Sequence, residues 1–185
     1  MGKIWFSSDL HFCHDRDFIY GPRGFNSVQE NNEVILEHFN KVVSWDDDLY
    51  LLGDNFLNDN NEGMKYLQRI PGRLHFIWGN HDTDTKQLLI ASMDRADILG
   101  YANIFKYDKY HFYLSHYPTL TDNYDSKKPL SHRLIDLYGH THQKTNHEKG
   151  QPYTMYHVGV DSHNCYPVNI EEIISDIQKF IKKEK

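Results

Sequence analysis

The sequence predicts an α/β sandwich in which two β-sheets pack against each other and helices cover the outside. In the first half of the chain, short apolar segments alternate with longer amphipathic ones, which favours βαβ units with parallel strands. In the second half, strand-like segments follow one another as in hairpins, which favours a mixed sheet. The 185 residues contain no interdomain linker and 39% of them are hydrophobic, so we expect one domain spanning residues 1–185.

The first half is expected to contain three strands, each followed by a helix. The predicted strands are residues 3–8, 48–53 and 73–79, and each ends at a polar residue with a short side chain, namely Asp9, Asp54 and Asn80. The predicted helices are residues 29–44, 61–70 and 85–93, and Pro71-Gly72 closes the second of them.

The second half is expected to contain four strands and a final helix. Residues 104–107 and 112–115 have the pattern of a hairpin that leads to His116, residues 134–139 end at His140, and residues 153–160 form another strand. Residues 170–182 have the pattern of an amphipathic helix with an apolar stripe that we expect in the core: Ile170, Ile173, Ile174, Ile177, Phe180 and Ile181.

Composition limits the classes of function. The net charge is −6 and the basic residues are scattered, apart from residues 179–185 at the end of the last helix, which argues against nucleic acid as a partner. No apolar run approaches the roughly 20 residues that cross a bilayer, and the first residues lack a signal-peptide pattern, so we expect no membrane association and a cytoplasmic location. Cys13 and Cys165 lack metal or redox spacing; free thiols are expected, with a disulfide as the alternative.

Short polar motifs at the ends of the predicted strands indicate a metal site. Ligands of α/β sheets bind beyond the carboxyl ends of the strands, so these motifs are expected to meet. The candidate metal ligands are carboxylates, imidazoles and one amide: Asp9, His11, Asp54, Asn80, His116, His140 and His142. This donor set suits Mn²⁺, which we place first, and also Fe, Zn²⁺ or Ni²⁺. It is too large for one ion that leaves a position open for water, and it predicts two divalent ions about 3.5–4 Å apart with a bridging carboxylate.

Two such ions favour phosphate chemistry. They carry four positive charges, of which Asp9 and Asp54 neutralise two, so the remainder attracts an anionic substrate and stabilises a phosphoryl transition state. Metal ions also lower the pKa of bound water from about 15.7 toward 7, which provides hydroxide as a nucleophile. His81 is predicted to donate a proton to the leaving alkoxide, and Asp82 to orient the His81 ring.

The motifs resemble, in order and approximate spacing, the signature of the calcineurin-like metallophosphoesterases, in particular small bacterial and phage members. The resemblance rests on five segments, Asp9-Leu10-His11, Gly53-Asp54, Gly79-Asn80-His81-Asp82, Ser115-His116 and Gly139-His140-Thr141-His142. It implies a four-layer αββα sandwich of two mixed β-sheets flanked by helices. It also implies that Asp9, His11, Asp54 and His142 hold one ion, that Asp54 bridges, and that Asn80, His116 and His140 complete the second. His81 would be the general acid, paired with Asp82.

Two residues in the loop after the first motif are candidate substrate ligands. Arg23 has the fork geometry that holds a phosphate, and His14 lies three residues after His11. Together these residues predict a phosphoric ester hydrolase that acts on a small phosphomonoester or phosphodiester by attack of metal-bound hydroxide. The alternatives are a nucleic-acid processing phosphodiesterase of the same fold and a binding scaffold without activity. The sequence leaves open whether the chain is a monomer or a homodimer.

Overall fold

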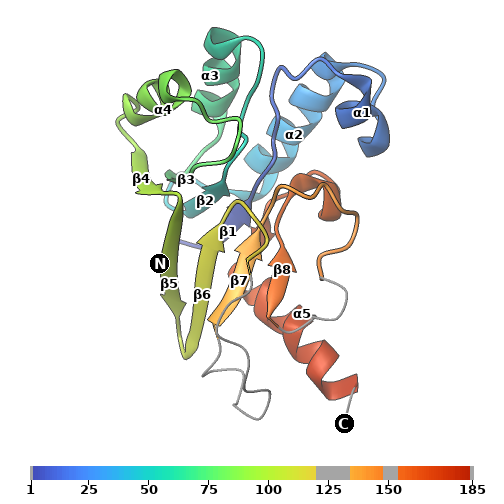
Figure 1. Cartoon of the computed structure of the whole chain (residues 1–185), viewed down its shortest axis with the longest axis vertical. Helices are drawn as coiled ribbons and strands as arrows, with labels where there is room; N and C mark the ends of the chain where they lie inside the picture. Colours follow the sequence, from blue (N-terminus) through green and yellow to red (C-terminus); the bar gives the residue numbers. More distant parts are fainter. Residues whose placement is uncertain (1, 120–133, 148–153, 184–185) are drawn as a thin grey trace.

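The computed structural model describes residues 2–119, 134–147 and 154–183, with side chains up to residue 179. It contains two β-sheets with helices around them (Figure 1). The first sheet has the strand order β4-β3-β2-β1-β9. Its strands are β1 (Ile4–Ser7), β2 (Asp48–Leu52), β3 (Arg73–Ile77), β4 (Ala96–Gly100) and β9 (Val168–Asn169). Strands β1 to β4 pair in parallel, and β9 pairs antiparallel with β1.

The second sheet has the strand order β5-β6-β7-β8. Its strands are β5 (Ala102–Tyr107), β6 (Tyr110–Ser115), β7 (Leu134–Tyr138) and β8 (Met155–His157). The β5–β6 hairpin is antiparallel, whereas β6, β7 and β8 pair in parallel. Both sheets are therefore mixed, as the sequence predicts.

The helices are α1 (Asp17–Tyr20), α2 (Val28–Val42), α3 (Asn60–Arg69), α4 (Asp84–Ala91) and α5 (Ile170–Lys183), with short 3-10 turns at Gly21–Arg23 and Val160–Ser162. Helices α2 and α3 begin at side-chain caps. Ser27 accepts a hydrogen bond from the amide of Glu30 at the start of α2, and Asp59 accepts one from the amide of Glu62 at the start of α3. Such caps satisfy amides that the first helical turn leaves without partners.

Two apolar clusters form the core, one on each face of the first sheet. Strand β1 shows the alternation, because Trp5 belongs to one cluster and Phe6 to the other. The Trp5 cluster joins β1, β2 and β3 to the buried stripes of α2 and α3, which include Phe39 and Leu67. The Phe6 cluster joins the same sheet to the second sheet and to α5, whose Ile173 is fully buried. The predicted sandwich of two mixed sheets with flanking helices is confirmed (Figure 1).

The structure adds elements that the sequence pattern did not predict. Strand β4 is missing from the prediction because its side chains are half-buried or exposed and show no alternation. Its backbone becomes a strand by pairing with β3. Helix α1 has only four residues, too few for a periodic signal. The predicted start of the strand at residue 153 and the side chains of Phe180 and Ile181 lie outside the described residues.

Cys13 and Cys165 are both free thiols, as expected. Within the described ranges, the helices are all too short or too polar to cross a membrane.

Candidate metal centre

The candidate ligands follow β1, β2, β3, β6 and β7, and their loops meet at one edge of the sandwich. Five of the seven have a positive backbone φ: Asp9 (56°), His11 (50°), Asp54 (55°), His140 (67°) and His142 (50°). Residues with a Cβ adopt this left-handed region rarely, and their clustering is typical of functional loops that the surrounding fold holds in place. The local backbone therefore turns at the ligand residues themselves.

The first donor group consists of Asp9, His11 and His142. Nε2 of His11 lies 3.2 Å from Nε2 of His142 and 3.7 Å from Oδ1 of Asp9. Nε2 of His142 lies 3.8 Å from the same Asp9 oxygen. The three side chains thus present one donor atom each toward a common point, which is the arrangement of ligands around one ion.

The second donor group consists of Asn80, His116 and His140. Oδ1 of Asn80 lies 2.9 Å from both Nε2 of His116 and Nδ1 of His140, and the two ring nitrogens are 3.2 Å apart. Oδ2 of Asp54 connects the groups, because it lies 3.5 Å from Nε2 of His116 and 3.9 Å from Nε2 of His11. Asp54 thus lies between the two groups, and the assignment of ligands to each ion that the resemblance implies stays a prediction.

Contacts behind the donors leave one atom of each carboxylate free to face the centre. Oδ2 of Asp9 accepts hydrogen bonds from the Ser8 hydroxyl (2.6 Å) and the His140 amide (2.8 Å), so Oδ1 is left for a metal. Oδ1 of Asp54 accepts from the His81 amide (2.9 Å), so its Oδ2 faces both groups.

Two of the imidazoles are fixed in the same way. Nδ1 of His116 must donate to the carbonyl of Leu52 (2.8 Å), because a carbonyl can only accept. Nδ1 of His142 donates to Oδ2 of Asp161 (2.9 Å). In both rings Nε2 then carries the lone pair that a metal ion requires.

The electrostatics of the centre fit cations. Oδ1 of Asp9 is buried without a hydrogen-bond partner, an expensive arrangement unless a cation binds there. Burial lowers the pKa of His116, but the Asp54 and Asp9 carboxylates raise it by more, to about 9, so this position attracts positive charge. Burial and nearby His142 lower the pKa of His11, which keeps its ring in the neutral form that binds metal.

Two glycines before the ligand residues are required by close packing. A Cβ on Gly79 would overlap Oδ1 of Asp54, and a Cβ on Gly139 would overlap the Ser8 hydroxyl and Oδ2 of Asp9. The Gly-Asn and Gly-His pairs of the sequence therefore let these loops approach the carboxylates.

His81 lines the cavity above the centre, as its predicted role requires, but the predicted role of Asp82 needs correction. Oδ2 of Asp82 accepts hydrogen bonds from the backbone amides of Gly79 (2.8 Å) and Asp54 (3.0 Å), and not from the His81 ring. Asp82 therefore ties the loop after β3 to the loop after β2. The backbone of His81 is held instead by Lys86, whose Nζ donates to the His81 carbonyl (2.7 Å).

The structure also corrects the role expected for Arg23. Its side chain is 1% exposed and forms a two-point ion pair with Asp161, at 3.0 Å from Nε to Oδ1 and from Nη2 to Oδ2. It also donates to the carbonyls of Asp9 (2.8 Å) and Leu10 (3.2 Å), so it clamps the first metal loop and does not face a substrate.

Asp161 contacts two residues of the site, and the sequence analysis assigned it no role. It holds both Arg23 and His142, and its side chain is 4% exposed. One signal was available, because Asp161 follows the apolar residues 158–160 just as Asp9 follows the first strand. Its partners, however, are decided by the tertiary fold.

The cavity over the donors has a volume of about 440 Å³. Its lining comprises five of the candidate ligands together with His14, Phe18, Ile19 and His81. His14 therefore lies where its predicted substrate role requires; that role stays a prediction.

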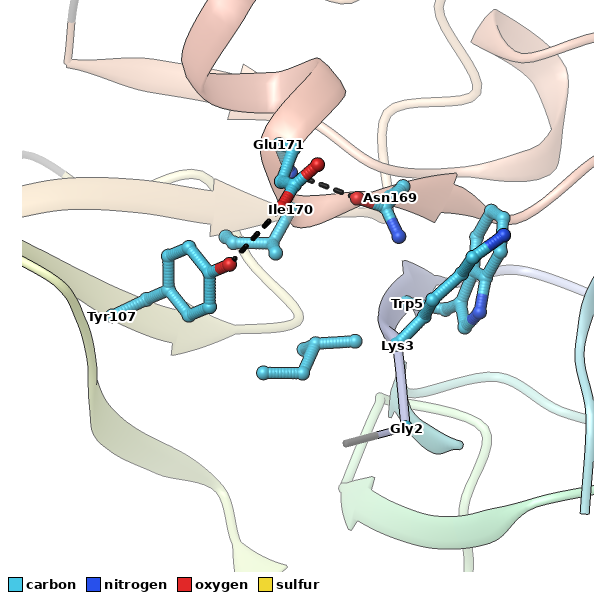
Figure 2. Close-up of a pocket in the computed structure, with 8 residues that line it drawn as sticks. Gly2, Lys3, Trp5, Tyr107, Asn169, Ile170 and Glu171 are labelled. Atoms are coloured by element: carbon cyan, nitrogen blue, oxygen red, sulfur yellow. Dashed lines mark hydrogen bonds between the residues drawn. The ribbon is translucent and has the colours of Figure 1, made fainter. Parts of the chain in front are cut away.

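Another cavity, of about 460 Å³, lies at the start of β1, the opposite end of that strand (Figure 2). There the Tyr107 hydroxyl donates to Glu171 (3.3 Å) and the Glu171 amide donates to Asn169 (2.9 Å).

Comparisons with known proteins agree with this geometry. Residues 3–159 match the calcineurin-like phosphoesterase superfamily domain. An uncharacterized protein of Methanocaldococcus jannaschii is 30% identical over 97% of this chain and 93% of its own length. The gene 66 protein of Mycobacterium phage D29 is 27% identical over 97% of this chain and 99% of its own.

A crystal structure of a protein of unknown function from Aquifex aeolicus has a similar fold, with a TM-score of 0.69 at 24% identity, covering 95% of this chain and 99% of that one. The family match spans the five motifs from Asp9 to His142 that form the donor groups. The chain belongs to the calcineurin-like phosphoesterase superfamily.

Proposed function

We propose that this protein hydrolyses a small phosphomonoester or phosphodiester with two divalent metal ions, Mn²⁺ first among Mn²⁺, Fe, Zn²⁺ and Ni²⁺. The observation that carries the proposal is the pair of donor groups that share Oδ2 of Asp54, at 3.5 Å from His116 and 3.9 Å from His11. One carboxylate oxygen between two sets of donors is the arrangement by which two-metal sites hold their ions.

Bound divalent ions supply Lewis-acid stabilisation and a lowered pKa for bound water. The chain supplies the remaining parts. Asp54 and Asp9 are the two carboxylates of the donor groups, which leaves a net positive charge for an anionic ester to neutralise. The net charge of −6 over the whole chain supports a small substrate rather than a nucleic acid.

His81 is the proposed proton donor to the leaving-group oxygen. Its ring lies 5.9 Å from the His11 ring, measured between centroids, and it lines the cavity beside the donors. Its backbone is fixed at both ends of the residue, since the amide donates to Asp54 and the carbonyl accepts from Lys86. In this role the His81 ring donates its proton to the leaving oxygen as the P–O bond breaks.

The test is hydrolysis of an aryl phosphomonoester and an aryl phosphodiester by protein loaded with each of the four metals, together with metal analysis. We expect turnover with Mn²⁺ and a loss of about 10²–10⁴ in kcat for His81→Ala at unchanged metal content. His111→Ala is the matched control, because His111 lies at the far end of β6 from His116.

Failure of the fully loaded wild-type protein to hydrolyse either ester would refute the proposal. Loss of metal in His81→Ala would instead make His81 a ligand. Cleavage of single- or double-stranded DNA at rates that exceed those on the small esters would favour the nuclease alternative.

A further inference from the structure

One wall of the metal-centre cavity is formed by the segment that follows β1. His14, Phe18 and Ile19 line this wall. Ile19 is 6% exposed and anchors α1 in the protein, whereas Phe18, its neighbour on the same short helix, is 67% exposed. The fold therefore holds an aromatic ring open to the cavity, where it has apolar surface left to bury.

The Phe18 ring continues a row of rings that starts at the proposed acid. The centroids of His81 and His14 are 6.4 Å apart, and those of His14 and Phe18 are 5.8 Å apart with an interplanar angle of 86°. A proton donor lies next to the leaving oxygen, so the rest of the leaving group must extend past His81. On this side of the cavity it meets His14 and Phe18.

The wall is held in place by hydrogen bonds of its own segment. The amide of Ile19 donates to the carbonyl of Arg16 (2.9 Å), and the amide of Phe25 donates to the carbonyl of Tyr20 (3.1 Å). Arg23 then fastens the segment to the carbonyl of Asp9, at 2.8 Å. The backbone that carries Phe18 is thereby fixed relative to the metal ligands, as a specificity element requires.

We propose that Phe18, together with His14, forms the leaving-group subsite and selects phosphate esters whose leaving group carries a planar ring. This inference rests on the proposed function, because His81 defines the side on which the leaving group departs. Edge and face contacts between rings favour a planar aromatic group over an alkyl chain of similar size.

The experiment compares Phe18→Ala with the wild-type protein, both loaded with Mn²⁺. Leu88→Ala is the matched control, because Leu88 is 73% exposed on α4 and does not line the cavity. One arm measures binding of phenylphosphonate and methylphosphonate by calorimetry, which does not depend on turnover. The other arm measures kcat and KM for an aryl and an alkyl phosphodiester. For each ester the value of the variant is divided by that of the wild type, because this ratio cancels the intrinsic reactivity of the ester.

We expect Phe18→Ala to reduce the preference for phenylphosphonate over methylphosphonate by about three- to tenfold. Its KM for the aryl ester should rise by a similar factor, with kcat changed less. Phe18→Trp, which keeps a planar ring, should retain the preference, and Leu88→Ala should leave it unchanged.

An unchanged preference in Phe18→Ala, with hydrolysis intact, would overturn the subsite and leave the proposed function standing. A reduced preference in a protein that hydrolyses neither ester would keep Phe18 as part of a binding site for planar rings, whereas the proposed function, and with it the leaving-group assignment, would fall.

Discussion

Replacing Asp161 by Asn tests whether the contacts behind the donors position the metal ligands. Asn keeps the shape of the side chain but removes its charge and one acceptor. In the native protein the Asp161 carboxylate accepts from Nδ1 of His142 (2.9 Å) and pairs with Arg23 at 3.0 Å through both oxygens. The variant therefore leaves a buried guanidinium without its counter-charge and the His142 ring without its fixed orientation.

The expected loss of stability follows from this burial. Removing one partner of a buried ion pair costs about 3–5 kcal/mol. Arg23 retains its bonds to the carbonyls of Asp9 and Leu10 and to Asn31, so we expect the lower end, about 3 kcal/mol in the free energy of unfolding. Loss of the hydrogen bond to His142 should in addition weaken metal affinity by about 10–100-fold.

The effect should depend on pH. Burial alone would raise the pKa of Asp161, but the hydrogen bond from His142 and the charge of Arg23 more than offset this, and the net pKa is lowered from 3.8. A carboxyl with a lowered pKa in the folded state stabilises the protein fully above its unfolded pKa, and that contribution is lost as the pH falls below it. The difference between wild type and Asp161→Asn should thus be largest near pH 7 and should shrink below about pH 4.

The assay is urea denaturation of the metal-free proteins at several pH values, followed by Mn²⁺ titration of each. Asp94→Asn is the control, since Asp94 is exposed. If Asp161→Asn unfolds at the same urea concentration as wild type and binds Mn²⁺ equally well, the reasoning about these contacts is refuted.

Three further changes test other parts of the protein. Lys86→Met removes the donor to the His81 carbonyl at 2.7 Å and should lower kcat by about 10–100-fold without changing metal content; an unaltered kcat would exclude this positioning role. Burial raises the pKa of Asp136 from 3.8 to about 7, although two hydrogen bonds to its carboxyl lower it. Between about pH 4 and pH 7 the folded protein therefore holds a proton that the unfolded chain has lost. The free energy of unfolding should thus fall as the pH rises through this range. Asp136→Asn should flatten that slope in pH-dependent thermal melts, and an identical slope would refute the assignment. Gly139→Ala places a Cβ against Oδ2 of Asp9 and should weaken Mn²⁺ binding in a calorimetric titration, whereas wild-type affinity would show that the loop can shift.

The strands and the ligand residues could be predicted because both signals are local. Each motif directly follows an apolar segment, as Asp9 follows β1 and Asp54 closely follows β2. Parallel pairing of β1 with β2 and β3 then brings the motifs to one edge, which the alternation of strands and helices already indicates. Strand β4 could not be predicted, because its partly exposed side chains show no alternation of buried and exposed positions. It forms a strand because its backbone pairs with β3.

Residue types and their spacing are enough to name the metal donors and to place them at the ends of strands. The hydrogen-bond partners of these donors depend on the tertiary fold. Arg23 and Asp161 are 138 positions apart, and nothing local in either segment shows that they form a buried pair. Asp82 is next to His81 in sequence, yet it binds backbone amides because the close approach of the loops after β2 and β3 leaves those amides without other partners. A side chain's chemistry is fixed by its type, whereas its partner depends on which groups burial brings within hydrogen-bond distance.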